Sequence, residues 1–288
     1  MLAKRRSIRV LDPSFFSTVE VTAGAALAYF DLMGSSERSD LDRLYRERLA
    51  GFLTEFDGLD AAHVVGTGPS MAAAMGDGPA TGLRIACNTI VASPADLERI
   101  DPHVICFADP AFHFGPSEYA DQFRSDLVRV VREREPYLIF PAQGGPLVER
   151  YLPGYQRSIG IRLRTARRFN IPHPGAQWVK RCGNVLTNLM LPTAVAAKAS
   201  RVVVYGCDGR DPADDGFWQH AAQYDAETYQ SVREIHPAFF DDRDYLRYYL
   251  KHTETLAAQI RWVEEAGVRV TSAQRSLIPA LAERYAPE

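Results

Sequence analysis

The segment Ala62-His63-Val64-Val65-Gly66-Thr67-Gly68-Pro69-Ser70 decides the fold class. Its first half is typical of a short buried strand, and the glycines let the chain turn directly into a helix. Such a turn brings backbone N–H groups close to a ligand, and the following helix favours negative charge. Because strand-to-helix turns also need glycine for geometry alone, the segment predicts strand, turn and helix first, and a nucleotide loop second.

Short apolar runs alternate with helical periodicity along the rest of the chain. We predict strands at Ala62–Gly66, Leu83–Cys87, His103–Phe107, Pro136–Phe140, Arg201–Gly206 and Val268–Val270. We predict helices after Ser70, after the N-cap pair Ser93-Pro94, over Gly183–Ala199 and over Tyr245–Glu265, with Gly267 as the final stop signal. This alternation indicates the α/β class, a mostly parallel sheet with helices on both faces.

The first 60 residues differ from this pattern. Val21–Met33 is apolar and rich in alanine, and Asp40–Phe56 carries apolar residues at helical spacing. We therefore predict two parts, a helical N-terminal extension over 1–60 and a nucleotide-binding α/β domain over 61–288.

Composition excludes several classes of protein. The 288 residues are 46% hydrophobic and 24% charged, with a net charge of −3, which is globular and unlike a nucleic-acid-binding chain. The longest apolar run, Val185–Ala197, contains Asn188 and Pro192, so we expect no transmembrane span. Met1–Arg6 has no apolar stretch behind it and does not indicate a secretory signal. Four separated cysteines argue against structural zinc and disulfides, so we expect a cytoplasmic protein.

Positive charge is concentrated in one block. Residues 150–207 contain no Asp or Glu but carry Arg150, Arg157, Arg162, Arg164, Arg167, Arg168, Lys180, Arg181, Lys198 and Arg201. Any one of these arginines is more often a solvated surface residue. The block as a whole predicts an anionic binding partner, such as a phosphate, a carboxylated sugar or a lipid surface. No motif favours nucleic acid.

Residues that are missing around the glycine loop restrict the classes of nucleotide that it could bind. A dinucleotide-binding fingerprint needs a small residue where Met71 stands and an acid where Cys87-Asn88 stands, and no Walker Gly-Lys-Ser/Thr is present. NAD, FAD and P-loop ATP chemistry are therefore disfavoured. Asn88 and Asp109 follow the next two strands, where ligands of parallel sheets bind, although both residue types also start turns.

The order of these motifs resembles bacterial sialyltransferases of the Campylobacter lipooligosaccharide type. The resemblance rests on Gly66-Thr67-Gly68-Pro69-Ser70, Cys87-Asn88, Phe107-Ala108-Asp109-Pro110, Lys180-Arg181-Cys182-Gly183-Asn184, Tyr205-Gly206-Cys207-Asp208 and a late histidine, across about residues 62–275. Archaeal pterin diphosphokinases and flagellin-glycosylating accessory factors share the Gly-x-Gly-Pro-Ser loop and the Gly-x-Asp strand end. The resemblance implies a Rossmann-like domain that binds a CMP-activated sugar.

The resemblance also implies roles for individual residues. Thr67, Ser70, Asn88 and Asp109, with Gly66 and Gly68 of the loop, would hold cytidine and ribose; Gly183, Asn184 and Asp208 would contact the nucleotide or donor; Arg181 would face the sugar carboxylate or the acceptor. The catalytic base would be His252, favoured by its interval to the last strand, with His236 as its rival. A helix-surface histidine is the alternative reading of His252. His113 follows a strand end and is a further substrate contact to consider.

This sequence departs from that family in one loop. Two tyrosines that would stabilise the departing phosphate are absent from Gly209–Trp218. Arg210 would replace one by charge, and Tyr224 or Tyr229 the other. Asp109 also stands where the family commonly has asparagine.

The implied reaction is metal-independent transfer of sialic acid, Kdo or a similar 2-keto acid to a glycan or glycolipid acceptor of surface polysaccharide or lipooligosaccharide. It needs no cofactor, since the CMP-sugar is the donor substrate, and Asp208–Asp215 is interpreted as a solvated turn rather than a metal site. Peripheral membrane association, at the inner face, and homo-oligomer formation stay open, and no nucleic-acid partner is expected. Two alternatives also stay open: a pterin-type diphosphokinase that uses ATP and magnesium, and a non-catalytic nucleotide-sugar-binding protein.

Overall fold

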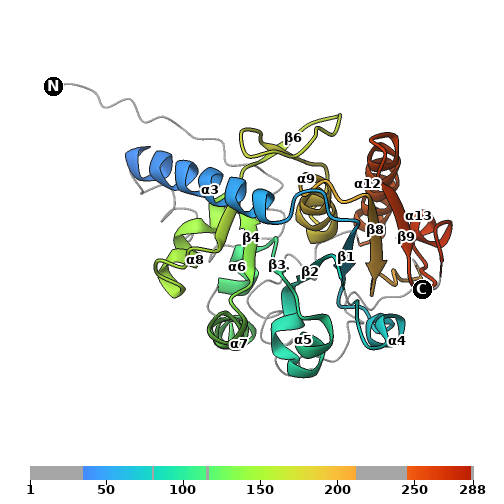
Figure 1. Cartoon of the computed structure of the whole chain (residues 1–288), viewed down its shortest axis with the longest axis horizontal. Helices are drawn as coiled ribbons and strands as arrows, with labels where there is room; N and C mark the ends of the chain where they lie inside the picture. The colour runs from blue at the N-terminus through green and yellow to red at the C-terminus, as the bar shows by residue number, and fades with distance from the viewer. Residues whose placement is uncertain (1–34, 80, 115–116, 212–244, 287–288) are drawn as a thin grey trace.

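A seven-stranded, all-parallel sheet forms the centre of the protein, seen here in a computed structural model that describes residues 35–79, 81–114, 117–211 and 245–286 (Figure 1). In spatial order its strands are β5 (Ser158–Ile161), β4 (Tyr137–Pro141), β3 (Val104–Cys106), β2 (Leu83–Cys87), β1 (Ala61–Val65), β8 (Arg201–Tyr205) and β9 (Arg269–Ser272). Every neighbouring pair is parallel. The chain builds the sheet outward from β1 to β5 and then returns to the other side of β1, so the order of strands reverses between β1 and β8.

Helices cover both faces of this sheet. One face carries α4 (Met71–Met75), α5 (Pro94–Ile100), α7 (Glu118–Arg134) and α8 (Gly145–Tyr151), and the other carries α3 (Ser35–Glu55), α9 (Leu191–Ala196) and α12 (Tyr245–Glu265) (Figure 1). Short helices η1 (Asn88–Ala92), α6 (Pro110–Phe114), η2 (Ala142–Gly144) and α13 (Pro279–Ala282) follow strand ends or close the chain.

Alternation along the strands explains the two cores. Val64 packs with the α3, α9 and α12 face and its neighbour Val65 with the α4, α5 and α7 face. Because the sheet is covered on both faces, the central strands are largely apolar on both of their faces, as in the fully buried run of β4. The predicted Rossmann-like α/β fold is confirmed.

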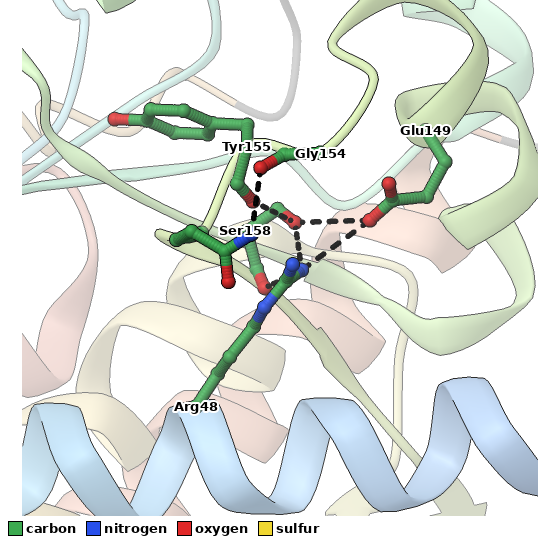
Figure 2. Close-up of polar contacts among 6 residues, drawn as sticks. Arg48, Glu149, Gly154, Tyr155 and Ser158 are labelled. Carbon is green, nitrogen blue, oxygen red and sulfur yellow. Dashed lines mark hydrogen bonds and ion pairs between the residues drawn. The ribbon is translucent and has the colours of Figure 1, made fainter.

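The N-terminal helix α3 packs at the edge strand β5. A Cβ at Gly160 would lie 2.5 Å from atoms of the Tyr45 ring, which is too close for any side chain, so glycine is needed there. Arg48 donates to the Ser158 hydroxyl at 2.5 Å and to the Ser158 carbonyl at 3.1 Å, and pairs with Glu149 at 3.3 Å (Figure 2). Phe52 is fully buried in the core shared with the sheet. The extension therefore contributes to the same core as the α/β domain from Tyr45 onward, whereas the predicted helix at 21–33 lies outside the described residues.

The predicted helix over Gly183–Ala199 is only partly right. The chain forms a π-helix, η3, over Leu186–Met190 before α9 begins. Pro192 has no N–H, so the carbonyl five residues earlier, on Thr187, lacks its π-helical donor. Gln259 of α12 donates its Nε2 to that carbonyl at 2.7 Å instead. The proline thus explains both the helical irregularity and the buried glutamine.

A second, two-stranded sheet pairs β6 (Leu163–Thr165) with β7 (Trp178–Lys180). It follows β5 directly, inside the basic block, and was not predicted from the sequence. Among the described residues no helix is long and apolar enough to cross a bilayer.

Candidate functional site

The glycine loop lies where the strand order reverses, between the carboxyl ends of β1 and β8. Gly66 donates its N–H to the Tyr205 carbonyl at 2.8 Å, and Gly68 donates to the Gly206 carbonyl at 2.9 Å. A Cβ at Gly66 would lie 2.6 Å from the Gly206 carbonyl oxygen. Gly206 itself has a φ of 60°, a conformation that glycine adopts readily. Both glycine stretches are therefore required for the two strand ends to meet, at the position where open α/β sheets bind ligands.

The Asp208 carboxylate packs directly on this loop. Its Oδ2 accepts from the Ser70 N–H at 3.4 Å, and a Cβ at Gly68 would collide with the same oxygen. The Ser70 hydroxyl is buried and has no hydrogen-bond partner among the described residues. Thr67 is buried beside it. The loop therefore already holds a negative charge from its own chain, and α4, which follows it, is only five residues long.

Asn88 and Asp109 stand on the next two strand ends, on the β2 and β3 side of the loop. Asn88 has a φ of 48°, a left-handed conformation that asparagine tolerates better than most residues. Its Oδ1 lies 3.3 Å from Nε2 of His113, whose Nδ1 lies 3.3 Å from the Tyr119 hydroxyl. Asp109 begins α6, where its Oδ1 accepts from the Phe112 N–H at 3.4 Å. Asp109 therefore also has the turn role that the sequence left open.

His113 is fully enclosed rather than placed on an open loop. Its ring stacks on Phe123, with centroids 4.2 Å apart. Burial lowers its pKa to about 3, so it is neutral at ordinary pH. Its contact with Asn88 fixes the position of that side chain.

Arg210 and Tyr249 meet beside Asp208. The Arg210 guanidinium carbon lies 5.6 Å from the centre of the Tyr249 ring, and the Arg210 backbone N–H bonds to the Tyr249 hydroxyl. Burial raises the pKa of Tyr249, so its hydroxyl stays protonated. A tyrosine therefore accompanies Arg210, contributed by α12 rather than by the loop.

His252 lies one turn further along α12, on the face that packs against residues 182–190. Tyr248 on that face donates its hydroxyl to the Gly183 carbonyl, and Thr255 hydrogen-bonds with the Cys182 thiol. His252 is 8% exposed, and its Nε2 is buried without a partner among the described residues. Burial lowers its pKa to about 4. The alternative of a helix-surface histidine is wrong.

Asn184 caps the π-helix. Its Oδ1 accepts from the Leu186 N–H at 2.8 Å. Gly183, beside it, is exposed and is joined to α12 through Tyr248. The guanidinium carbon of Arg181 lies 5.3 Å from the Phe169 ring centre. Phe169 in turn contacts Trp262 of α12. Arg181 is thus placed on an aromatic support.

Three candidates, His236, Tyr224 and Tyr229, lie outside the described residues, as does the loop from 212 to 218. Sequence reasoning missed Tyr248 and Tyr249 as site residues. The available signal was their position in the first turns of the helix that leads into β9, because a helix that runs to the amino end of a parallel strand begins at the opposite, ligand-binding edge of the sheet.

The cysteines are free thiols in the described structure. Burial raises the pKa of the Cys87 thiol, with a smaller contribution from Cys207, and burial followed by the charge of Asp208 raises the pKa of the Cys207 thiol to about 12. Neither thiol is therefore an activated nucleophile. Within the described ranges, no three His, Cys, Asp or Glu side chains gather as a metal-binding group.

Comparison with protein-family models and with curated protein sequences finds no match for this chain.

Proposed function

We propose that the protein is a CMP-sugar-dependent glycosyltransferase that moves a 2-keto sugar acid, such as sialic acid or Kdo, to a glycan acceptor. The observation that carries the proposal is the convergence at the β1/β8 switch point of Asp208 on the glycine loop with the Arg210–Tyr249 pair of the adjoining helix. The order of motifs that resembles the bacterial sialyltransferases supports it.

The negative charge of Asp208 determines which part of the donor binds at the glycine loop and which part binds near Arg210. A phosphate laid on the loop would meet the Asp208 carboxylate at contact distance and be repelled. Ribose hydroxyls, in contrast, donate to a carboxylate and to the Ser70 and Thr67 oxygens. The nucleoside therefore fits the loop, with Asn88 and Asp109 at its far side, and the single phosphate of a CMP-sugar extends toward Arg210.

Arg210 and Tyr249 suit the leaving group. As the anomeric carbon–oxygen bond breaks, the bonding electrons pass to the phosphate oxygen, and CMP departs with one more negative charge. The guanidinium and a protonated tyrosine hydroxyl stabilise that charge by charge-assisted hydrogen bonds.

His252 would accept the acceptor's proton. The new bond forms between the acceptor oxygen and the anomeric carbon, and the hydroxyl proton moves to Nε2. Because its pKa is about 4, His252 is neutral and able to accept a proton at neutral pH. Its Nε2 is buried and lacks a partner among the described residues, so an acceptor hydroxyl would reach it only after the packing around His252 is displaced.

The diphosphokinase alternative has one observation in its favour. The Asp208 carboxylate beside the loop would hold a magnesium ion that bridges to ATP phosphates. Magnesium-dependent ATP binding is therefore the result that would replace the transferase proposal.

Donor turnover tests the proposal. CMP-activated 2-keto sugar acids are incubated with the full chain in EDTA, and release of CMP is followed with and without glycan acceptors at the cytoplasmic face of membrane preparations. We expect slow hydrolysis that acceptors accelerate, and loss of most turnover in His252→Gln with retained CMP affinity. CMP binding without any turnover would indicate a nucleotide-sugar-binding protein.

A further inference from the structure

The segment 162–181, here called the β6–β7 arm, lies outside the main sheet. It leaves the carboxyl end of the edge strand β5, pairs β6 with β7, and lies on the outer side of the α3, α9 and α12 layer (Figure 1). In that view the arm is a loop that extends beyond the neighbouring helices.

The arm is held in a fixed position by its base. The Trp178 side chain is buried in the main core, and the Trp178 backbone N–H donates to the Arg162 carbonyl at 2.8 Å. Phe169 lies between Trp262 of α12 and the Arg181 guanidinium, and Asn170 donates to the Gln177 carbonyl at 3.1 Å. These contacts fix the backbone of the arm against the main core and α12, so its exposed side chains project from a fixed backbone.

Three arginines on that surface have no acidic partner within the described part of the chain. Arg164, Arg167 and Arg168 are exposed, and none forms an ion pair there. Arg162, at the base of the arm, reaches Asp42 at 3.9 Å. The block from 150 to 207 supplies no Asp or Glu to neutralise the three.

Ile171 follows Arg168 by three residues and is 65% exposed, the highest value among the exposed large apolar side chains described. The next residue, Pro172, is buried, so the chain turns back into the fold directly behind it. An isolated exposed isoleucine is unremarkable, but one in a segment with three exposed arginines that form no ion pair among the described residues has the combination that lipid surfaces bind.

We propose that the β6–β7 arm docks on an anionic lipid membrane. Arg164, Arg167 and Arg168 attract the headgroups, and Ile171 enters the acyl boundary. Exposed cations on a segment that extends from the fold can reach a flat anionic bilayer, whereas a small ligand is typically enclosed by a concave site. Nucleic acid is disfavoured because no exposed aromatic side chain accompanies the arginines on the arm. The proposal is independent of the glycosyltransferase reaction, although a membrane-borne acceptor would suit both.

Vesicle co-sedimentation tests this with the full chain. Vesicles of phosphatidylcholine alone are compared with vesicles containing phosphatidylglycerol, at low and at high salt. We expect binding to the anionic vesicles only, weakened by salt. The triple variant Arg164→Gln, Arg167→Gln, Arg168→Gln should bind at least tenfold less tightly, since each basic residue near such a surface contributes about 1 kcal/mol, or roughly fivefold. Ile171→Ser should also bind the anionic vesicles less tightly. Because this substitution removes an apolar contact, the loss of affinity that it causes should depend less on salt than the loss in the triple variant.

The matched control removes the same charge from the opposite face of the sheet. The variant Arg99→Gln, Arg132→Gln, Arg134→Gln changes residues of α5 and α7 and should bind like the wild type. Of the three, Arg132 is exposed, whereas Arg99 and Arg134 are half-buried and pair with Asp96 and Asp101, so its melting temperature is measured alongside. Equal loss in both triple variants would overturn the proposal in favour of net charge alone. Binding of the wild type to neutral vesicles, no binding to either kind, or tighter arm-dependent binding to single-stranded RNA would also overturn it. A fall in melting temperature in the arm variant alone, with vesicle binding unchanged, would assign the arginines to contacts within the chain.

Discussion

Oδ2 of Asp208 accepts a hydrogen bond from the Ser70 backbone N–H at 3.4 Å, across 138 residues of sequence. The glycine loop and the end of β8 therefore form one unit, and the negative charge of that unit decides which part of a nucleotide it can hold. A nucleoside with hydroxyl donors is accepted, and a bare phosphate is repelled.

Gly68→Ala tests this contact. The added methyl group would collide with the Asp208 carboxylate and lie 2.6 Å from the Gly206 carbonyl oxygen. We expect the free energy of unfolding to fall by about 1–3 kcal/mol and CMP binding to be lost. Chemical denaturation and calorimetry measure the two effects. Gly51→Ala is the control, because nothing lies within 4 Å of its added Cβ in helix α3, and alanine should stabilise that helix by up to ~1 kcal/mol. Unchanged CMP affinity in Gly68→Ala would show that the loop does not hold the nucleotide.

Arg210→Gln separates the leaving-group role from folding. If Arg210 stabilises departing CMP, donor turnover should fall by about 10²–10³ with little change in melting temperature. Tyr249→Phe should show a smaller loss in the same direction. Arg269→Gln, an exposed arginine at the amino end of β9, is the control and should keep full turnover. Full activity in Arg210→Gln would remove Arg210 from the reaction.

Arg48 is predicted to be a stability residue rather than a site residue. Its side chain is 8% exposed and contacts Glu149 and Ser158 at the amino end of β5, the edge opposite the candidate site (Figure 2). Arg48→Met leaves Glu149 without its cation and should lower the free energy of unfolding by about 3 kcal/mol. Arg43→Met removes an exposed pair with Asp40 and should change it by less than ~0.5 kcal/mol. Equal effects in the two variants would contradict the buried network.

Acid should destabilise the protein before its carboxylates are protonated. Burial lowers the pKa of His113 to about 3, and of His103 and His252 to about 4. Between about pH 6.5 and those values the unfolded chain binds protons that the folded chain does not, so stability falls as pH falls. Each histidine contributes a slope of up to about 1.4 kcal/mol per pH unit. Urea unfolding from pH 7.5 to 4.5 measures the slope, and His113→Gln should reduce it whatever its effect at pH 7.5. A flat profile would mean that these rings are protonated in the folded protein.

Local sequence predicted most of the sheet. Val64-Val65, Ile85-Ala86 and Val202-Val203-Val204 are continuous apolar runs because their strands are covered on both faces, and the predicted bounds differ from the observed ones by a residue or two. The same logic failed for β5, where Ser158 and Gly160 have low strand propensity. That strand is held by pairing with β4 and by the Tyr45 ring over Gly160, which are long-range contacts.

Helix α7 was the largest element overlooked, although Ser117 caps it and Phe123, Leu127 and Val130 follow at helical spacing. For the site, the glycine turn and the strand-end residues could be placed from the sequence, because strand ends meet at one edge. The positions of Tyr249 beside Arg210 and of Arg181 on Phe169 could not, since they depend on how α12 packs.

Calorimetric titration of the full chain with CMP in EDTA tests the central claim most directly, with CDP, UMP, GDP, ATP and NAD titrated in parallel, with and without magnesium. We predict metal-independent binding of CMP that Gly68→Ala abolishes and Gly51→Ala preserves. Binding of ATP with magnesium alone, or of no nucleotide at all, would contradict the account.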